Sequence, residues 1–331
     1  MIILLTHVPE ARIQYYGERA LAGLRALAPV MLHEGPQPLD PDGLAAAAAA
    51  ASVIVADRAT AVPATVFERL PQLQAVVRVA VDIRNIDVAA AGRAGVLVTR
   101  ARPGFMAAVS ELALGLMVDL SRGVSAATAA YRADRAPEVR MGRQLSGATA
   151  GLIGYGSIAR HLAPILLAIG MRVVVADPYA SVDDPRLTAM PLDQLLGEAD
   201  YVICLAVATA ETENLIDAAA LGRMRPHAVF VNLSRGNLVD EAALEGALAA
   251  GRIAGAAMDV GRAPDQMPSP HLARLPGVIA TPHIGGLTPQ AVEAQSLETV
   301  EQVRAILSGA VPTGGVNGET WSRRPRPGPP A

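Results

Sequence analysis

Six short apolar runs between residues 149 and 281 constrain the fold of this chain more than any other feature. Each is five to seven residues long and continuous, without the alternation typical of a strand that has one face in water. Such runs are typical of parallel strands covered on both faces. Helical stretches separate them, so the series predicts a doubly wound parallel sheet. The runs are residues 149–153, 172–176, 201–206, 228–233, 254–260 and 277–281.

The first hundred residues show the same alternation on a smaller scale. Helical stretches separate four β-rich runs, and one of these stretches, residues 10–27, carries a stripe of Leu21, Leu24 and Leu27. This pattern predicts a second parallel α/β domain. The four runs are residues 1–6, 52–56, 74–79 and 95–99.

Two longer helices are predicted to frame the larger domain. The first, about residues 105–123, is apolar nearly all round and should be buried between domains or subunits. The second begins at Thr288 and Pro289, a suitable N-cap and first position, and stops before Gly309. If the chain crosses between domains on these helices, the first domain is discontinuous. The expected parts are residues 1–100 with 287–312, residues 101–286, and a disordered proline-rich tail over 313–331.

Composition excludes several classes of protein. The formal net charge of −3 lacks the positive excess that a nucleic-acid-binding surface needs. No apolar run reaches the roughly 18 residues of a membrane helix, and the start of the chain is interpreted as a first strand rather than a signal peptide. A single cysteine, Cys204, excludes a disulfide framework and favours a cytoplasmic location.

The stretch GLIGYGSIAR, residues 151–160, is the clearest candidate for a cofactor site. It follows a predicted strand and opens a predicted helix. Gly154 permits a tight turn, Gly156 lets the backbone approach a pyrophosphate, and Ala159 permits close packing of the helix on the strand. The phosphates would then lie at the positive N-terminus of the helix. A structural turn without a ligand is the alternative interpretation.

Asp177 ends the second strand of this unit, 23 residues after Gly154. A carboxylate at this position accepts hydrogen bonds from both hydroxyls of an adenine ribose and repels a 2′-phosphate. No arginine follows it directly. The sequence therefore favours NAD over NADP. No cluster of histidine, cysteine and acidic residues has metal-ligand spacing, so no metal is expected.

Arg235 and His283 are the candidates for chemistry on a carbonyl group. Arg235 follows the predicted strand 228–233, and His283 follows the last strand. Both therefore come after carboxyl ends of strands, where open α/β sheets bind ligands. A cation can hold and polarise a carbonyl substrate, and a histidine can donate or accept its proton near neutral pH.

With these motifs in place, the chain resembles the D-isomer-specific 2-hydroxyacid dehydrogenases over nearly all of its length to about residue 310. The resemblance rests on the glycine loop and on segments of similar order and spacing. These are NIDVAAAGRAGVLVT (85–99), SELALGLMVDLSRG (110–123), VNLSRGNLVDE (231–241), AAMDV (256–260) and TPHIGG (281–286).

The resemblance implies two doubly wound parallel-sheet domains, with a Rossmann-type nucleotide-binding domain inserted into a flavodoxin-like substrate domain. It also implies a homodimer that forms through residues 105–145, and a small hydroxy or keto acid as substrate. Arg235 would bind that substrate, His283 would be the acid/base, and Asp259 would lie near the nicotinamide. The expected cofactor-binding residues are Gly154, Tyr155, Gly156, Ser157, Ile158, Asp177, Pro178, Val207, Asp259 and Gly285.

Two departures from the family pattern matter for function. The family places a glutamate, which pairs with the catalytic histidine, five residues after Asp259. Here that slot holds Pro264, or Ala263 with a one-residue gap, and neither can pair with His283. The adjacent Asp265 is a shorter candidate for the same part.

The second departure lies in VRVAVDIRNID, residues 77–87, where the family has a Gly-x-Gly turn that holds the substrate carboxylate. Ala80, Val81 and Asp82 are the expected substrate-binding residues here. Asp82 either forms a structural pair with Arg78 or Arg84, or recognises a polar or cationic group of an unusual substrate.

The sequence thus predicts an NAD-dependent 2-hydroxyacid dehydrogenase. Two alternatives stay open at this point: an NAD(H)-binding sensor or scaffold with little turnover, favoured by the missing glutamate, and 3-phosphoglycerate dehydrogenase.

Overall fold

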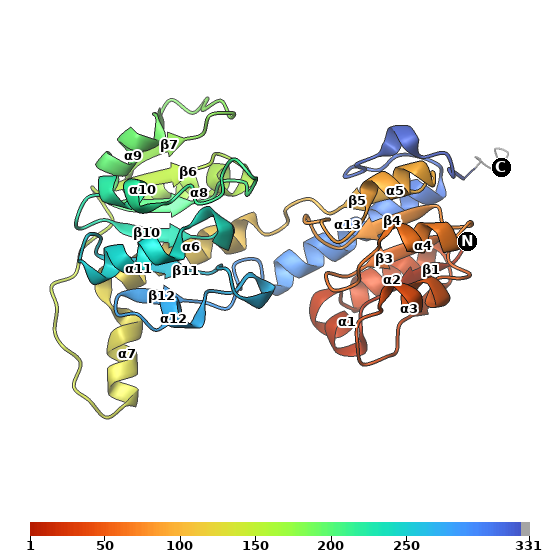
Figure 1. The fold of residues 1–331 in the computed structure, drawn as a ribbon, viewed down its shortest axis with the longest axis horizontal. Coiled ribbons are helices and arrows are strands. Elements are labelled where there is room, and N and C mark those ends of the chain that lie inside the picture. The colour runs from red at the N-terminus through yellow and green to blue at the C-terminus, as the bar shows by residue number, and fades with distance from the viewer. Residues whose placement is uncertain (326–331) are drawn as a thin grey trace. The chain divides into compact units, whose positions relative to one another are not determined.

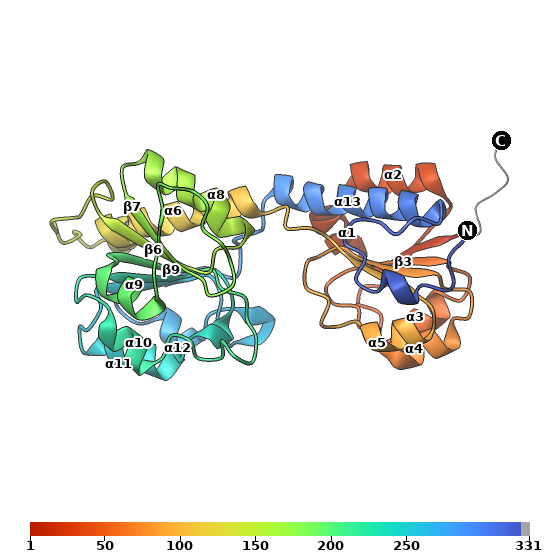
Figure 2. The same ribbon diagram turned by 90° about the horizontal axis from the view of Figure 1, so that it is seen from above.

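The computed structural model describes residues 1–325 and divides into two compact units. Unit 1 contains Met1–Gly104 and the segment that begins at Pro289, and unit 2 is Phe105–Thr288. These boundaries fall a few residues beyond the predicted ones. Each unit has its own parallel sheet, with helices on both faces (Figures 1 and 2).

Unit 2 has a seven-stranded parallel sheet in the order β12-β11-β10-β9-β6-β7-β8. β6 pairs with both β7 and β9, so the direction in which the strands are added reverses there. All six predicted strands are present. β8 was not predicted, because its two residues are exposed and form no apolar run. The strands are β6 (Thr149–Ile153), β7 (Arg172–Ala176), β8 (Thr188–Ala189), β9 (Tyr201–Cys204), β10 (Val229–Asn232), β11 (Gly255–Met258) and β12 (Val278–Ala280).

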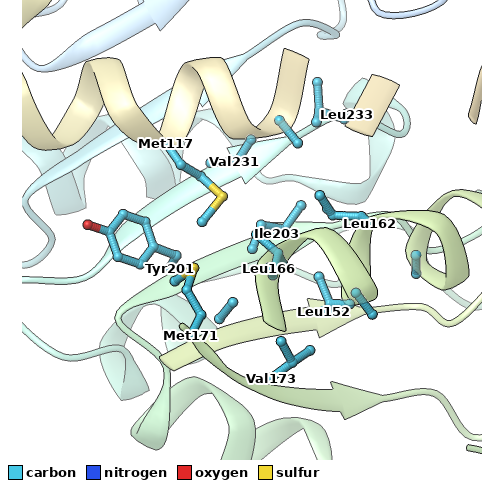
Figure 3. Packing of buried hydrophobic residues seen from close by; sticks show 14 of the residues in the cluster. Met117, Leu152, Leu162, Leu166, Met171, Val173, Tyr201, Ile203, Val231 and Leu233 are labelled. Atoms are coloured by element: carbon cyan, nitrogen blue, oxygen red, sulfur yellow. The ribbon is translucent and has the colours of Figure 1, made fainter. Parts of the chain in front are cut away.

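Two hydrophobic clusters cover the faces of this sheet. On one face, Met117 and Leu166 of two helices pack against strand residues such as Ile203 (Figure 3). On the other, leucines of four shorter helices, among them Leu195 and Leu244, complete the core. The helices are α6 (Met106–Arg122), α7 (Val124–Arg132), α8 (Ser157–Ala168), α9 (Leu192–Glu198), α10 (Ala218–Arg223), α11 (Glu241–Ala249) and α12 (Pro270–Ala273).

α6 and α7 differ in how far they are covered. Within unit 2, α6 buries one side against α8 and the sheet, while Val118 on its other side is 39% exposed. α7 buries none of its residues and extends away from the sheet (Figure 1). Gly123, with φ +66°, separates them. In the described part of the chain no single helix has the length and apolar character to cross a membrane, and only this bent pair passes by those two measures together.

Unit 1 has a five-stranded parallel sheet in the flavodoxin-like order β2-β1-β3-β4-β5. β2, at the edge and only partly buried, was not predicted. The predicted helix 10–27 is two helices, because Gly17 adopts φ +84° between them. The strands are β1 (Ile3–Leu5), β2 (Val30–Leu32), β3 (Val53–Ala56), β4 (Ala75–Arg78) and β5 (Leu97–Arg100).

The helices of unit 1 lie in two layers (Figure 2). α13 packs on α2, where a Cβ on Gly23 would lie 3.0 Å from Val300, and Val303 is fully buried in the same core cluster. The layers are α1 (Pro9–Tyr15), α2 (Glu18–Leu27) and α13 (Pro289–Leu307) on one face, and α3 (Pro41–Ala47), α4 (Ala64–Arg69) and α5 (Val88–Arg93) on the other. The predicted fold class, two doubly wound parallel-sheet domains, is confirmed.

The predicted disordered tail is wrong for residues 313–325, which pack along the edge of β5. The side chain of Asn317 accepts a hydrogen bond from the Val98 N–H at 2.7 Å and donates one to the Val96 carbonyl at 2.9 Å. Trp321 is 4% exposed, and its indole N–H donates to the carbonyl of Gln74. Composition misled the prediction because an open sheet edge offers backbone partners to a polar segment. Residues 326–331 of the predicted tail lie outside the described residues.

If residues 313–325 are an integral edge of unit 1, Asn317→Ala should lower the free energy of unfolding. The change leaves buried backbone groups of β5 without partners, which costs about 2–4 kcal/mol. Urea unfolding measures it, with Ser322→Ala, a change at an exposed side chain, as the control. Equal unfolding midpoints for the two variants would mean that the segment is dispensable.

Candidate cofactor and substrate site

The loop from β6 to α8 combines one crowded glycine with one open glycine. Gly154 has φ +90°, and a Cβ there would lie 2.7 Å from the Cα of Ala206. A Cβ on Gly156 would meet no atom within 4 Å. Among the described residues no side chain caps α8, which begins at Ser157. The uncapped N–H groups and the free space beside Gly156 fit a bound phosphate, as the NAD interpretation requires.

Asp177 follows β7 and is anchored to this loop. Its Oδ2 accepts a hydrogen bond from the Tyr155 N–H at 2.7 Å, and its Oδ1 accepts from Tyr179 N–H at 2.8 Å and Ala180 N–H at 3.0 Å. Burial of part of the side chain favours the neutral acid, but these N–H groups and Arg160 outweigh it and hold the pKa of Asp177 below its ordinary value. The site therefore carries a permanent negative charge at the ribose end.

Other predicted cofactor residues also follow carboxyl ends of strands in unit 2. Ser157 and Pro178 are exposed, Ile158 is half-buried, and Val207, in the loop after β9, is 77% exposed. All of these lie at the edge of the sheet to which β6 contributes the glycine loop.

Arg235 follows β10, and its backbone is fixed by Asn232. The Asn232 side chain donates to the Arg235 carbonyl at 3.0 Å and accepts from the Ser234 N–H at 3.1 Å. The guanidinium Nη1 of Arg235 donates to the Ser234 carbonyl at 2.7 Å. The next residue, Gly236, lies so close to the backbone of Gly261 that a Cβ would be 2.1 Å away. The turn that carries Arg235 is thus tightly defined.

Asp259 holds the loop that carries His283. The carboxylate is 2% exposed and accepts hydrogen bonds from Thr281 Oγ1 at 2.6 Å, Ile284 N–H at 2.8 Å and Gly285 N–H at 2.8 Å. His283 lies between these anchored residues, and its backbone has φ +55°, a conformation that is uncommon for a non-glycine residue. The sequence predicted Asp259 and Gly285 as cofactor contacts. It gave no sign that Asp259 also holds the loop that carries His283.

Arg262 is a further residue that the sequence did not single out. Its guanidinium donates to the carbonyls of Asn237 and Val239 and pairs with Glu213 at 2.9 Å. Its N–H donates to Glu241 Oε1 at 3.1 Å. Arg262 thereby ties the loops that follow β9, β10 and β11 together. Its partners lie 21 to 49 residues away along the chain, so no local signal could have revealed them.

Asp265, the proposed substitute for the family glutamate, lies in the short turn Pro264–Gln266 between β11 and α12. Its side chain lies outside the described part of the structure. Its pairing with His283 therefore stays a prediction.

In unit 1, the predicted substrate loop follows β4. Ala80 is buried and Val81 is half-buried. The carboxylate of Asp82 accepts hydrogen bonds from the Arg84 guanidinium at 2.7 and 3.0 Å, and the Asp82 carbonyl accepts one from Arg78 Nε at 2.9 Å. This geometry favours the structural pair over recognition of a cationic substrate group.

A buried polar cluster of His7, Asp57 and Arg78 adjoins this loop, since Arg78 donates to the Asp82 carbonyl. Burial lowers the pKa of His7 to about 4, with Arg78 and Arg12 acting in the same direction and Asp57 against them. Burial likewise lowers the pKa of Arg78 to about 10. His7 and Arg78 are each 3% exposed. The described residues contain no group of three or more histidine, cysteine or acidic side chains placed to hold a metal ion.

Comparison with known proteins decides the family. Residues 114–285 match the family model of the D-isomer specific 2-hydroxyacid dehydrogenase NAD binding domain. The (S)-sulfolactate dehydrogenase of Chromohalobacter salexigens is 36% identical over 269 residues, which are 80% of this chain and 87% of the relative. The chain belongs to the D-isomer specific 2-hydroxyacid dehydrogenases.

Other members of this 2-hydroxyacid dehydrogenase family frame the comparison. The D-3-phosphoglycerate dehydrogenase of Mycobacterium tuberculosis is 36% identical over 282 residues, 84% of this chain but 53% of the relative. The chain thus spans about half the length of that relative. A solved protein from Thermus thermophilus superposes with a TM-score of 0.84 at 31% identity, covering 96% of this chain and 100% of that one. The family predicted from the sequence is confirmed, and unit 2 contains its NAD-binding domain.

The lowered pKa of His7 predicts how the stability of the folded protein depends on pH. Its pKa in the folded protein, about 4, lies below the ordinary histidine value of 6.5, so the unfolded chain binds more protons between these values. Stability should therefore fall as the pH drops from 6.5 to 4, by up to about 3 kcal/mol from this group. Urea unfolding at pH 7 and at pH 4.5 measures this loss, and the free energy of unfolding of His7→Gln should fall less between the two pH values than that of wild type. The exposed His271→Gln is the control, and identical pH slopes for wild type and His7→Gln would contradict the argument.

Proposed function

We propose that this chain is an NAD-dependent oxidoreductase that transfers a hydride between NAD(H) and a 2-hydroxy or 2-keto acid or a close analogue. One observation carries the proposal. The glycine loop, Asp177, Arg235 and His283 all follow carboxyl ends of strands of the unit 2 sheet. That edge is where open parallel sheets bind ligands.

In the proposed reduction, Arg235 holds the carboxylate of the keto acid and polarises its carbonyl group. Bound NADH, held by the glycine loop and Asp177, would supply the hydride to the carbonyl carbon. As the C–H bond forms, the carbonyl electron pair moves onto oxygen, and protonated His283 donates a proton to that oxygen. The products are the hydroxy acid, NAD⁺ and neutral His283. Asp259 serves this step by accepting hydrogen bonds from the Thr281 hydroxyl before His283 and from the Ile284 N–H after it.

The substrate class follows from the same residues with support from the relatives. Ala80, Val81 and Asp82 are proposed to bind the acid from unit 1, with the charge of Asp82 balanced by Arg84. The named relatives act on phosphoglycerate and sulfolactate, both of which carry a second anionic group. A second candidate substrate is therefore 3-phosphoglycerate. A sensor with little turnover is the alternative, because Pro264 stands where the family has its glutamate.

We also propose that the protein is a homodimer that forms through residues 105–145. Apolar side chains of α7 and the following segment support this. Val124 is 54% exposed, Tyr131 69%, Val139 98% and Met141 99%. Such a concentration of exposed apolar groups is typical of an interface.

The single cysteine, Cys204, supports a cytoplasmic location.

Arg235→Lys tests the proposed chemistry. Lysine keeps the charge but loses the planar two-pronged contact with a carboxylate, so kcat/KM should fall by about a hundredfold or more. The assay follows NADH absorbance with glyoxylate, pyruvate, hydroxypyruvate, sulfopyruvate and phosphohydroxypyruvate. NADH affinity should stay nearly intact. Arg225→Lys, in contact with Asp200 before β9, is the control. If the wild type turns over none of these acids, the sensor is favoured. If kcat/KM of Arg235→Lys equals that of wild type, Arg235 is not part of the substrate site.

Asp265→Asn tests whether Asp265 replaces the family glutamate. A carboxylate beside an imidazolium stabilises the protonated ring, which is the form that donates in reduction. Its loss should therefore move the alkaline limit of reduction to lower pH, while oxidation, which needs neutral His283, should persist. The measurement is the pH profile of kcat/KM in both directions. A reductive limit that stays in place would mean that Asp265 does not replace the family glutamate.

A further inference from the structure

The turn that carries Arg235 is anchored at both ends. Arg235 directly precedes the short helical turn Gly236–Leu238. At the front of the turn, the fully buried side chain of Asn232 donates to the Arg235 carbonyl at 3.0 Å. This anchor belongs to β10 itself. The anchor at the far end comes from Arg262, which follows β11.

Arg262 holds the far end of the turn through backbone carbonyl groups. Its Nη2 lies 3.0 Å from the carbonyl oxygen of Asn237 and 3.1 Å from that of Val239. Its Nε lies 3.2 Å from the same oxygen of Val239. A guanidinium is a rigid planar fork of N–H donors, so one side chain can hold two carbonyl groups at a set distance from each other.

The loop that follows β9 keeps the Arg262 guanidinium in place. Glu213 Oε1 accepts from it at 2.9 Å, and Asn214 Oδ1 accepts from it at 2.6 Å. The Asn237 side chain donates to the other carboxylate oxygen of Glu213 at 2.8 Å. Hydrogen bonds from Asn237 and Arg262 hold the pKa of Glu213 below its ordinary value, so this partner of Arg262 stays ionised at neutral pH.

The main chain beside Arg262 contacts the same turn. Gly261 lies so close to Gly236 that a Cβ on Gly236 would be 2.1 Å from its carbonyl carbon. The Arg262 N–H donates to Oε1 of Glu241, the first residue of α11, at 3.1 Å. Main-chain and side-chain contacts of Arg262 therefore both act on the segment 236–241.

We propose that Arg262 is a positioning residue for the proposed reaction and acts through Arg235. By holding the carbonyl groups of Asn237 and Val239, it fixes the backbone from which the Arg235 side chain reaches the keto acid. A two-pronged contact between a guanidinium and a carboxylate tolerates little displacement, so a loosened turn weakens substrate binding. The inference rests on the proposed function and deepens it.

A positioning part and a purely structural part predict different kinetics. If Arg262 only stabilises the fold, the loss caused by Arg262→Gln should multiply with the loss caused by Arg235→Lys. If Arg262 acts through Arg235, its removal should matter only while Arg235 is present. A double-mutant cycle on kcat/KM separates the two cases.

The experiment measures kcat and KM by NADH absorbance for wild type, Arg262→Gln, Arg235→Lys and the double variant. The substrate is whichever of glyoxylate, pyruvate, hydroxypyruvate, sulfopyruvate and phosphohydroxypyruvate the wild type turns over fastest. We expect Arg262→Gln to lower kcat/KM by about tenfold or more, mainly through a higher KM for the acid. In the Arg235→Lys background the same change should cost less than about threefold. The dissociation constant of NADH, measured by fluorescence, should stay within about twofold of the wild-type value.

A conservative variant and a matched control complete the design. Arg262→Lys should recover part of the lost substrate binding, since an ammonium keeps the charge and N–H donors for the same acceptors. Arg172→Gln is the control, because Arg172 pairs with Glu198 at 2.6 Å but lies at the start of β7, at the opposite edge of the sheet. It should leave the KM for the acid unchanged. Thermal unfolding identifies any variant that misfolds, and Arg262→Lys takes the place of Arg262→Gln in the cycle in that case.

Two results would overturn the positioning part of Arg262. One is a double variant in which the two losses of kcat/KM multiply. The other is a KM for the acid that is the same in Arg262→Gln and wild type. A wild type that turns over none of the five acids would instead contradict the proposed function, so the two failures are distinguishable.

Discussion

The parallel pairing of β6 with both β7 and β9 is the constraint on which the rest of unit 2 depends. β6 is fully buried, and its register places Ile153 beside Ala176 on one side and Cys204 on the other. With every strand parallel, all carboxyl ends meet at one edge. At β6 the direction in which strands are added to the sheet reverses, and open α/β sheets bind ligands at such a point; here the space beside Gly156 is open.

Polar side chains then fix the loops that the sheet brings together, and Asp259, Asn232 and Glu241 among them are buried. Asp259 brackets the His283 loop, Asn232 sets the backbone of Arg235, and Arg262 with Glu241 ties the neighbouring turns to each other. Each replaces water by several protein donors or acceptors, which a buried carboxylate or amide requires. The same groups that make the edge stable therefore also give it a defined geometry, as chemistry on a small acid demands.

Where this chain departs from its family, the structure clarifies one case. Asp82, in the segment where the family has a Gly-x-Gly turn, forms a two-pronged pair with the neighbouring Arg84. The loop is further fixed by buried Arg78 through the Asp82 carbonyl. A negative charge near an anionic substrate is thus compatible with the proposed function.

The sequence by itself determined the fold class, the glycine loop, and the placement of Asp177, Arg235 and His283 after strands. These follow from local patterns, since periodicity, strand length and turn residues act over a few neighbours. It missed β2 and β8, which are short edge strands with little apolar signal, and it took residues 313–325 for a tail. Only the tertiary structure decided the parts of Asp259 and Arg262, the packing of Trp321, and the approach of Arg160 to Asp177. Each depends on groups far apart in the chain, and their hydrogen bonds exist only once the sheets have brought those groups together.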